Sequence, residues 1–591
     1  MKNKKLSKNE IFSAVLTLLM LILLFVARKP FLAAVYLLTV CVFSVECIVR
    51  GLRGRVEYYK LLSNTILIAG IILFSLVNGY SLSGLWKGLP ALLLAAMLAV
   101  YLSFMDKLRW KEALKRGVSG FLAALMLTVT LFYMTNINTR IKPKAESLKE
   151  GHDKYLEAIR SGASANNKNV LFILMDDMGY GDLPALADTV IELPNLERLA
   201  ENGVVMEQFY SSNPVCSPSR FGCLTGRYAF RGHVDNVFFP TIPSGNIVND
   251  IMSPFMNSMF PKGVNGILGD EITVAEVLQA AGYATGVFGK WHLGDFGEYL
   301  PNNQGFDYFY GSHYSNDMNP YSFYRNGDID LAEFDQKEIN RILTDEVIDF
   351  IDRSKDGPFF AYYASPWPHE PIHAGEEFLG TSKAGLYGDC LEEFDAGLGE
   401  ILAKLEAEGI LDDTLIIFTS DNGPWFEGST GGLRGRKNNN FNGGQMVPFI
   451  ASHPSLPQGA RINNPAMNID LFPTILAFCG IDILPDDRTI DGVNILPLLS
   501  GEAERMDREL FFISGSGKIN GILQNEFKYF ENIGSENAAY PFVYSLKKHL
   551  YRLDTDRAEA YNVYDLYPEQ ARRLETRLAE FIAAAEESPR K

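Results

Sequence analysis

Residues 169–177, Asn-Val-Leu-Phe-Ile-Leu-Met-Asp-Asp, establish the architecture of this chain. Six apolar residues, 170–175, follow one another without a polar break and end on two aspartates. An apolar run of this length is typical of a parallel strand that is buried on both faces of a sheet. Open α/β sheets bind their ligands at the carboxyl ends of such strands. We therefore expect a buried strand that carries Asp176 and Asp177 into a site.

Strand and helix patterns alternate downstream of this strand. Further strand candidates are residues 284–288, 358–364, 414–419 and 448–452, and the helical stretches between them are 273–281, 338–353, 386–408 and 470–479. Alternation of this kind predicts an α/β domain with a largely parallel central sheet and helices on both faces. We assign residues 167–500 to this domain.

The pattern changes after about residue 500. Residues 509–514 and 521–530 have the composition of strands in a small antiparallel sheet, and residues 568–585 that of a closing helix. Residues 501–591 are therefore predicted to form a small C-terminal antiparallel subdomain.

The first 136 residues differ from the rest of the chain. They contain five apolar runs of 17–19 residues, namely 11–27, 31–49, 61–79, 89–105 and 118–135. A helix that rises ~1.5 Å per residue needs about this length to cross a hydrocarbon core of ~30 Å. Residues 1–136 are therefore predicted to form an all-α bundle of five transmembrane helices, and the polar residues 137–166 a linker.

Lysine and arginine indicate the orientation of these spans. The N-terminus and the loops after the second and fourth spans carry 13 basic residues, whereas the opposite loops carry few. Because the basic side of a membrane protein faces the cytoplasm, the N-terminus is predicted to be cytoplasmic. Five spans then place residues 167–591 outside the cytoplasm, with the lipid bilayer as a partner. The net charge of −17 argues against nucleic acid as a further partner.

A second strand candidate, residues 415–418, also ends on oxygen-bearing side chains. The segment Thr419-Ser-Asp-Asn-Gly-Pro424 supplies the carboxylate of Asp421 and the amide of Asn422. Adjacent carboxylates repel one another and need a compensating cation, and a hard divalent ion prefers oxygen ligands. A solvated acidic turn would explain Asp176 and Asp177 taken alone, but the second acidic strand end favours a metal site.

The stretch Asn213-Pro-Val-Cys-Ser-Pro-Ser-Arg-Phe-Gly-Cys-Leu-Thr-Gly-Arg227 contains Cys216 followed by Pro218, Ser219 and Arg220. A lone cysteine is usually a buried, inert thiol. The Cys-x-Pro-Ser-Arg pattern nevertheless resembles the signature of the sulfatase family, in which a maturation enzyme oxidises the cysteine to Cα-formylglycine. The resemblance implies that one hydroxyl of the hydrated aldehyde attacks sulfur and that the other later expels the sulfate.

The same resemblance, which runs from about residue 169 to the end of the chain, implies a fold and a metal. The fold of the family is an alkaline-phosphatase-like α/β sandwich with a smaller C-terminal subdomain. The residues that would bind one Ca²⁺ are Asp176, Asp177, Asp421, Asn422 and the modified Cys216. Asp421 would also help to deprotonate the attacking hydroxyl.

Residues 289–294, Gly-Lys-Trp-His-Leu-Gly, supply two further candidates. Lys290 and His292 lie two residues apart, so in an extended segment both side chains could reach one anion. By resemblance, Lys290 binds the formylglycine and sulfate oxygens. His292 would remove the proton from the remaining hydroxyl so that sulfate can leave, a task that suits a pKa near neutrality.

Three more residues complete the predicted site. His369, in Pro366-Trp-Pro-His-Glu-Pro-Ile-His373, matches a family histidine that contacts the sulfate and protonates the leaving alcohol. Lys437 lies in a stretch similar to a family run of lysine, an aromatic residue, glutamate and two glycines, with Asn442 here in place of the glutamate. Arg220, one helical turn beyond Cys216, would brace the diol and balance the carboxylates.

Together these matches predict a membrane-anchored sulfatase, similar to the arylsulfatase A and N-acetylgalactosamine-6-sulfatase branch, that acts on a sulfated sugar or an aryl sulfate. Two alternatives stay open. A phosphoryl-group or phosphoethanolamine transferase of the same superfamily would also pair five spans with an exported domain, but those enzymes use threonine at the position of Cys216. A membrane sensor with a decayed sulfatase-like domain would keep the fold without the activity.

Overall fold

The computed structural model describes residues 147–162, 165–241, 265–318, 321–515, 517–534, 544–545, 547–588 and 590–591. The five predicted transmembrane runs lie outside these residues and stay a prediction. Among the helices that are described, none combines the length and the apolar character needed to cross a membrane.

The main sheet of the described region has ten strands in the order β12-β2-β11-β9-β1-β8-β4-β5-β6-β7. β1 (Asn169–Met175) is the strand predicted from the apolar run, and it pairs in parallel with β9 (Thr414–Ser420) and β8 (Phe359–Ala364). The other strands are β2 (Gly203–Met206), β4 (Ala284–Lys290), β5 (Tyr308–Ser312), β6 (Phe323–Arg325), β7 (Asp328–Leu331), β11 (Phe449–Ser452) and β12 (Ala460–Ile462).

The sheet is mixed, so the prediction of a largely parallel sheet is correct for its centre and for the edge pair of β12 and β2. β9, β1, β8, β4 and β5 are parallel neighbours. β11 instead runs antiparallel to β9 and β2, and β6 and β7 add antiparallel ladders beyond β5. Antiparallel neighbours need no helical crossover, which is why the short segments between β5, β6 and β7 suffice.

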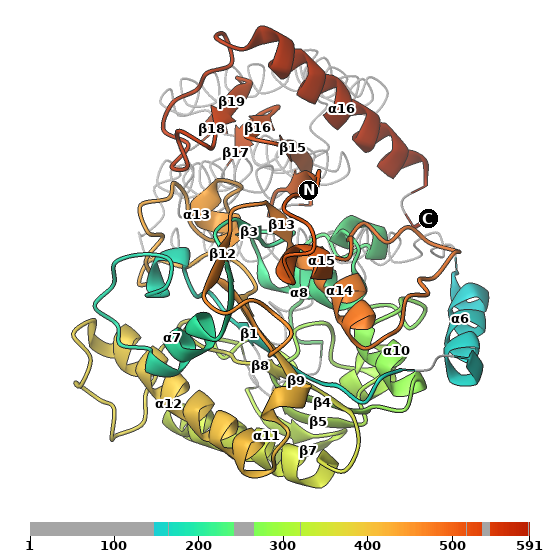
Figure 1. The fold of residues 1–591 in the computed structure, drawn as a ribbon, viewed down its shortest axis with the longest axis vertical. Helices are drawn as coiled ribbons and strands as arrows, with labels where there is room; N and C mark the ends of the chain where they lie inside the picture. Colours follow the sequence, from blue (N-terminus) through green and yellow to red (C-terminus); the bar gives the residue numbers. More distant parts are fainter. Residues whose placement is uncertain are drawn as a thin grey trace, which may run out of the picture. The chain divides into compact units, whose positions relative to one another are not determined.

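Helices cover both faces of this sheet, as predicted (Figure 1). One face carries α7 (Pro194–Glu201), α11 (Ile339–Ser354) and α12 (Gly385–Ala407), and the other carries α6 (Lys149–Gly162), α8 (Cys216–Thr225), α10 (Val274–Ala280) and α14 (Leu471–Phe478). Leu171 and Ile173 of β1 are buried in the core under α7, α11 and α12, and Val170 and Phe172 are buried in the core on the other face. Burial on both faces explains why the run has no polar residue.

The predicted helices agree with α10, α11, α12 and α14 to within one residue at each end. α10 shows why its start could be read from the sequence. The Thr273 side chain accepts a hydrogen bond from the Glu276 backbone at 3.0 Å, and the Glu276 carboxylate accepts one from the Thr273 backbone at 2.9 Å. This reciprocal capping box fixes the first turn of the helix.

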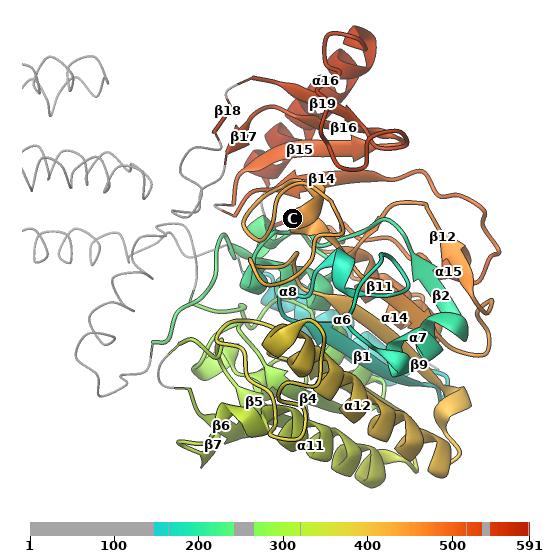
Figure 2. The same ribbon diagram turned by 90° about the vertical axis from the view of Figure 1, so that its left-hand side faces the viewer.

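A second, antiparallel sheet lies in the C-terminal region, with α16 (Pro568–Glu587) packed against it (Figure 2). Its strands are β14 (Glu509–Ile513), β15 (Ile519–Gln524), β16 (Phe527–Phe530) and β19 (His549–Arg552). The prediction of one strand over 521–530 is wrong, because the chain turns between β15 and β16. Asn525 adopts a φ of 56° in that turn, a left-handed conformation that asparagine tolerates.

Two smaller sheets are also described. β10 (Met446–Val447), β3 (Phe209–Tyr210) and β13 (Ala466–Met467) form one, and β17 (Ile533–Gly534) and β18 (Tyr544–Ser545) form the other. Two short helices are α13 (Asn442–Gln445) and α15 (Leu496–Leu499).

Part of the predicted linker is folded. α6 lies within residues 137–166, and it buries Tyr155, Leu156 and Ile159 in the core that also contains α10. The prediction of a linker is therefore wrong for residues 149–162. Apolar residues one turn apart give this otherwise polar segment a single buried face, and that face is enough to dock it.

Candidate active site

The site is built at the carboxyl ends of two adjacent strands. β1 and β9 pair in parallel with Met175 opposite Ser420, so the residues that follow them are neighbours at one edge of the sheet. These residues are Asp176, Asp177, Asp421 and Asn422, here called the strand-end cluster. The four side chains are almost fully buried, with exposed fractions of 0–3%. The Asp421 backbone also donates a hydrogen bond of 3.0 Å to the Met175 carbonyl, which ties the two ends together.

The predicted nucleophile position lies directly against this cluster. Cys216 is the first residue of α8, a helix buried along its whole length, and its Sγ is 3.4 Å from Asp176 Oδ1. One ligand atom from each of Asp176, Asp177, Cys216 and Asp421 lies within 4.8 Å of the others. The structure therefore brings together residues that lie up to 245 positions apart in the chain.

Each carboxylate of the strand-end cluster faces at least one cationic side chain. Lys290, the last residue of β4, forms an ion pair with Asp176. Lys437 Nζ is 2.7 Å from Asp177 Oδ1, and Arg220 Nε is 2.9 Å from Asp421 Oδ2. All the predicted basic residues of the site thus converge on the predicted acidic ones.

The carboxyl groups do not ionise independently. Burial favours the neutral form of Asp176, but the neighbouring cations, Lys290 foremost, outweigh it and hold the pKa of Asp176 well below its usual range. Burial and the negative charge of Asp176 raise the pKa of Asp421 to about 7. Carboxylates this close need further positive charge before all of them ionise at neutral pH.

The donor set fits a hard divalent cation. The Nδ2 of Asn422 donates to Asp177 Oδ1 at 2.6 Å, so the Oδ1 of Asn422 points away from that contact. This Oδ1 is buried and has no hydrogen-bond partner among the described residues. An orphaned amide oxygen beside three carboxylates is an oxygen-rich set of the kind that Ca²⁺ prefers.

The two predicted histidines lie near the cluster. His292 is 1% exposed, its Nε2 is 3.0 Å from the Phe238 carbonyl, and burial together with Lys290 holds its pKa well below the usual value. His369 Nε2 lies 3.8 Å from Asp177 Oδ2, and burial followed by the charge of Lys437 lowers its pKa. Both imidazoles are therefore neutral near pH 7.

One assumption about His292 is wrong. The sequence predicts an extended conformation for residues 290–292, but β4 ends at Lys290 and His292 has a φ of 58°. The backbones of Trp291 and His292 still donate to the carbonyls of Ser312 and His313, so the left-handed conformation redirects the chain only at His292.

Two polar residues near the site were missed. Ser315 Oγ is 3.1 Å from Lys290 Nζ and 3.3 Å from His369 Nδ1, and the same His369 nitrogen is 3.1 Å from Asn316 Oδ1. Both follow β5, the neighbour of β4 in the parallel part of the sheet. A polar run after a third buried strand was the sequence signal that could have identified them.

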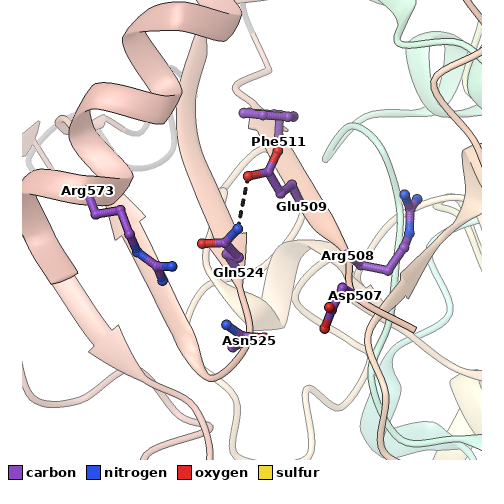
Figure 3. Close-up of a pocket in the computed structure, with 7 residues that line it drawn as sticks. All are labelled: Asp507, Arg508, Glu509, Phe511, Gln524, Asn525 and Arg573. Carbon is purple, nitrogen blue, oxygen red and sulfur yellow. Dashed lines mark hydrogen bonds between the residues drawn. The ribbon is translucent and has the colours of Figure 1, made fainter. Parts of the chain in front are cut away.

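A separate cavity lies in the C-terminal sheet, between the start of β14, the β15–β16 turn and α16 (Figure 3). Its volume is about 580 Å³, and its lining residues are Asp507, Arg508, Glu509, Phe511, Gln524, Asn525 and Arg573. None of them belongs to the predicted site, so this cavity is distinct from it.

Comparisons with known proteins show which family the chain resembles. The sulfatase family matches residues 168–481. The chain is 37% identical to human N-acetylgalactosamine-6-sulfatase over 387 residues, which covers 61% of this chain and 71% of that protein. It is 32% identical to Bos taurus arylsulfatase A over 476 residues, or 71% of this chain and 90% of the relative. A solved structure from work on glycosaminoglycan metabolism by Bacteroides thetaiotaomicron superposes with a TM-score of 0.62 at 26% identity, covering 70% of this chain and 99% of that one.

Proposed function

The chain belongs to the sulfatase family and is a sulfuric ester hydrolase, and from this premise we propose that it is a membrane-anchored enzyme that removes sulfate from sulfated sugars. The observation that carries the proposal is the packing of Cys216 against three carboxylates, with one ligand atom of each within 4.8 Å of the others. The names of its relatives support a sulfated sugar or an aryl sulfate as substrate, because they include an N-acetylgalactosamine-6-sulfatase and an arylsulfatase.

We propose that position 216 is matured to Cα-formylglycine by a separate maturation enzyme and that the site binds Ca²⁺. The hydrated aldehyde would supply a hydroxyl nucleophile, and Ca²⁺ would supply positive charge for the sulfate oxygens. The residues that would hold the ion are Asp176, Asp177, Asp421, Asn422 and the modified Cys216. The orphaned Oδ1 of Asn422 supports this assignment.

The cationic residues would bind the sulfate group. With the carboxylates committed to a metal ion, Lys290, Lys437 and Arg220 would face the anion whose charge grows in the transition state. Fixed charges in a buried site stabilise such a transition state more strongly than they could in water.

The histidines would move protons on either side of the sulfate. His292 is neutral because its pKa is lowered by burial, so it can accept a proton. We assign to the protonated form of His369, which the negative charge of a bound sulfate would favour, the delivery of a proton to the leaving alcohol oxygen. Its ring lies within hydrogen-bond distance of Ser315 and Asn316.

The membrane assignment is a separate proposal that comes from the sequence. Five apolar runs of 17–19 residues and the one-sided distribution of 13 basic residues support a multi-pass anchor. In this arrangement the N-terminus is cytoplasmic and residues 167–591 act outside the cytoplasm. The spans anchor the enzyme in the lipid bilayer.

The transferase alternative lacks a supporting observation, because the nucleophile position is Cys216 and the named relatives are sulfatases.

The sulfatase proposal is tested with full-length protein produced alongside a formylglycine-generating enzyme. Mass spectrometry of the peptide that contains position 216 should show conversion, and the matured protein should release sulfate from an aryl sulfate and from members of a sulfated saccharide panel. Cys216→Ala should release none. An intact thiol in fully active material, or no release by fully converted protein, would overturn the proposal.

A further inference from the structure

One cationic residue of the site, Lys437, lies on a loop rather than at a strand end. This loop, residues 435–444, is here called the Lys437 loop. On its catalytic side, the Lys437 backbone donates to the Pro424 carbonyl at 3.0 Å and the Asn438 backbone donates to the Pro214 carbonyl at 2.9 Å. Pro424 follows the strand-end cluster and Pro214 precedes Cys216, so the loop spans both halves of the site.

The other side of the loop is held by two charged residues from the C-terminal region. Lys528 of β16 donates from Nζ to the Asn440 carbonyl at 3.0 Å and to Asn442 Oδ1 at 2.8 Å. Glu559 accepts a hydrogen bond from the Asn442 backbone through Oε2, and its Oε1 lies 3.0 Å from Lys528 Nζ. The pair therefore forms hydrogen bonds with backbone atoms of the loop as well as with the Asn442 side chain.

The surroundings of this pair make its geometry strict. Both side chains have an exposed fraction of 0%. The Lys528 ammonium also lies over three aromatic rings, with centroid distances of 4.1 Å to Phe512, 5.1 Å to Phe530 and 5.5 Å to Tyr210. Charges removed from water are tolerated only where their remaining hydrogen bonds are made, so a shift of the loop would leave a buried charge without its partners.

We propose that Lys528 and Glu559 are positioning residues for sulfate ester hydrolysis, acting through the Lys437 loop to keep Lys437 at Asp177. The inference rests on the proposed function, because the position of Lys437 affects the rate only if Lys437 faces the substrate. It assigns the C-terminal sheet a part in catalysis without substrate contact by either residue. A contact at Asn442 can affect the position of Lys437 directly, since the two residues are five positions apart in the Lys437 loop.

The test compares Glu559→Gln and Lys528→Met with Leu574→Ala in full-length, matured protein. Leu574 lies on α16 and is fully buried in the core of the same sheet, and its apolar side chain makes no hydrogen bond or ion pair with the loop. Its truncation therefore lowers stability by leaving a cavity. At a temperature well below every melting transition, we expect kcat to fall by roughly 10-fold to 100-fold in the two charge variants, the cost of a small misplacement of a catalytic group. Leu574→Ala should keep kcat within about twofold of the wild type, because it perturbs packing only.

Hydrogen exchange gives a readout that does not depend on activity. Amides of residues 437–444 should exchange faster in Glu559→Gln than in the wild type, and Leu574→Ala should leave them protected. If the charge variants lose melting temperature as Leu574→Ala does while keeping kcat and loop protection, the pair is structural only and the inference is wrong. If the matured wild type releases no sulfate, the proposed function fails by itself, and loop protection alone then decides whether the pair holds the loop.

Discussion

The strand-end cluster and Lys437 are held in place in different ways. The strand-end cluster needs only the parallel register of β1 and β9, because that register sets its residues side by side. Lys437 instead depends on a loop that is anchored in part by the C-terminal region, including a contact between Asn442 and Glu559, 117 positions later in the chain. Backbone pairing fixes the cluster, and buried side-chain contacts help to fix Lys437.

This difference indicates what each can tolerate. A strand end cannot move without breaking the central sheet, so substitutions there change chemistry and leave geometry intact. The Lys437 loop can move when a distant side chain changes. We therefore expect the strand-end cluster to be sensitive only to its own residues and Lys437 to be sensitive to the C-terminal region as well.

The largest effect is expected for Asp421→Asn. The substitution keeps the shape of the side chain and an acceptor for Arg220, but it removes a charge from the strand-end cluster. We expect kcat/KM for an aryl sulfate to fall on the order of 10³-fold or more. Asp413→Asn is the matched control, because Asp413 lies just before the opposite end of β9 and pairs with Lys168 at the surface. Retention of a tenth of the activity by Asp421→Asn would contradict a metal-binding and catalytic role.

Lys437→Met should come next. It removes one fixed cation from the sulfate site, which costs on the order of 10²–10³ in rate. Because Glu559→Gln acts only through the position of the same lysine, adding it to Lys437→Met should cost little more. Steady-state kinetics of the two single variants and the double variant give this coupling. Additive losses would mean that Glu559 acts by another route.

Strand register positions the strand-end cluster, whereas side-chain contacts position Lys437. This difference also explains what the sequence could predict. Strand ends are local signals: an apolar run followed by Asp176 and Asp177 predicts both the strand and the site. The edges of the sheet were not predictable in this way, since strand direction depends on which neighbour a segment meets. Nor was the pair of Lys528 and Glu559, because a lysine on a short strand is usually solvent-exposed. Its burial arises from the aromatic rings that the fold places around it.

Calcium removal should separate the strand-end cluster from the rest of the fold. If the strand-end cluster binds Ca²⁺ only in the folded state, free Ca²⁺ at 100 times its dissociation constant adds about 2.7 kcal/mol to the free energy of unfolding. Chelation should therefore lower the melting temperature of the wild type. Asp177→Asn should weaken that response, whereas Glu559→Gln, which leaves every proposed ligand in place, should keep it. An equal response in all three proteins would place the ion elsewhere.

The smallest effect is expected at α6, where a titrating side chain adds to the docking by the apolar face. His152 Nε2 is 3.0 Å from Glu276 Oε1, and Nδ1 is 2.9 Å from Asp153 Oδ1. Burial lowers the pKa of His152, but the hydrogen bonds and charges of Glu276 and Asp153 outweigh burial and raise it above its usual value. The folded state therefore binds this proton more tightly than the unfolded state does. The resulting stabilisation is complete below pH ~6.5, the usual pKa of histidine, and is lost as the pH rises through the raised value.

Hydrogen exchange of α6 amides between pH 5.5 and 8.5, corrected for intrinsic rates, should report this loss, with a change below about 1 kcal/mol, the range of weak ion pairs. His152→Gln is the control, since glutamine can still donate to Glu276 but cannot titrate in this range. Its α6 amides should show no pH-dependent loss of protection. Glu276 itself is unsuitable for substitution, because its carboxylate also caps the first turn of α10. If wild type and His152→Gln lose protection in parallel, α6 is held by its apolar face alone.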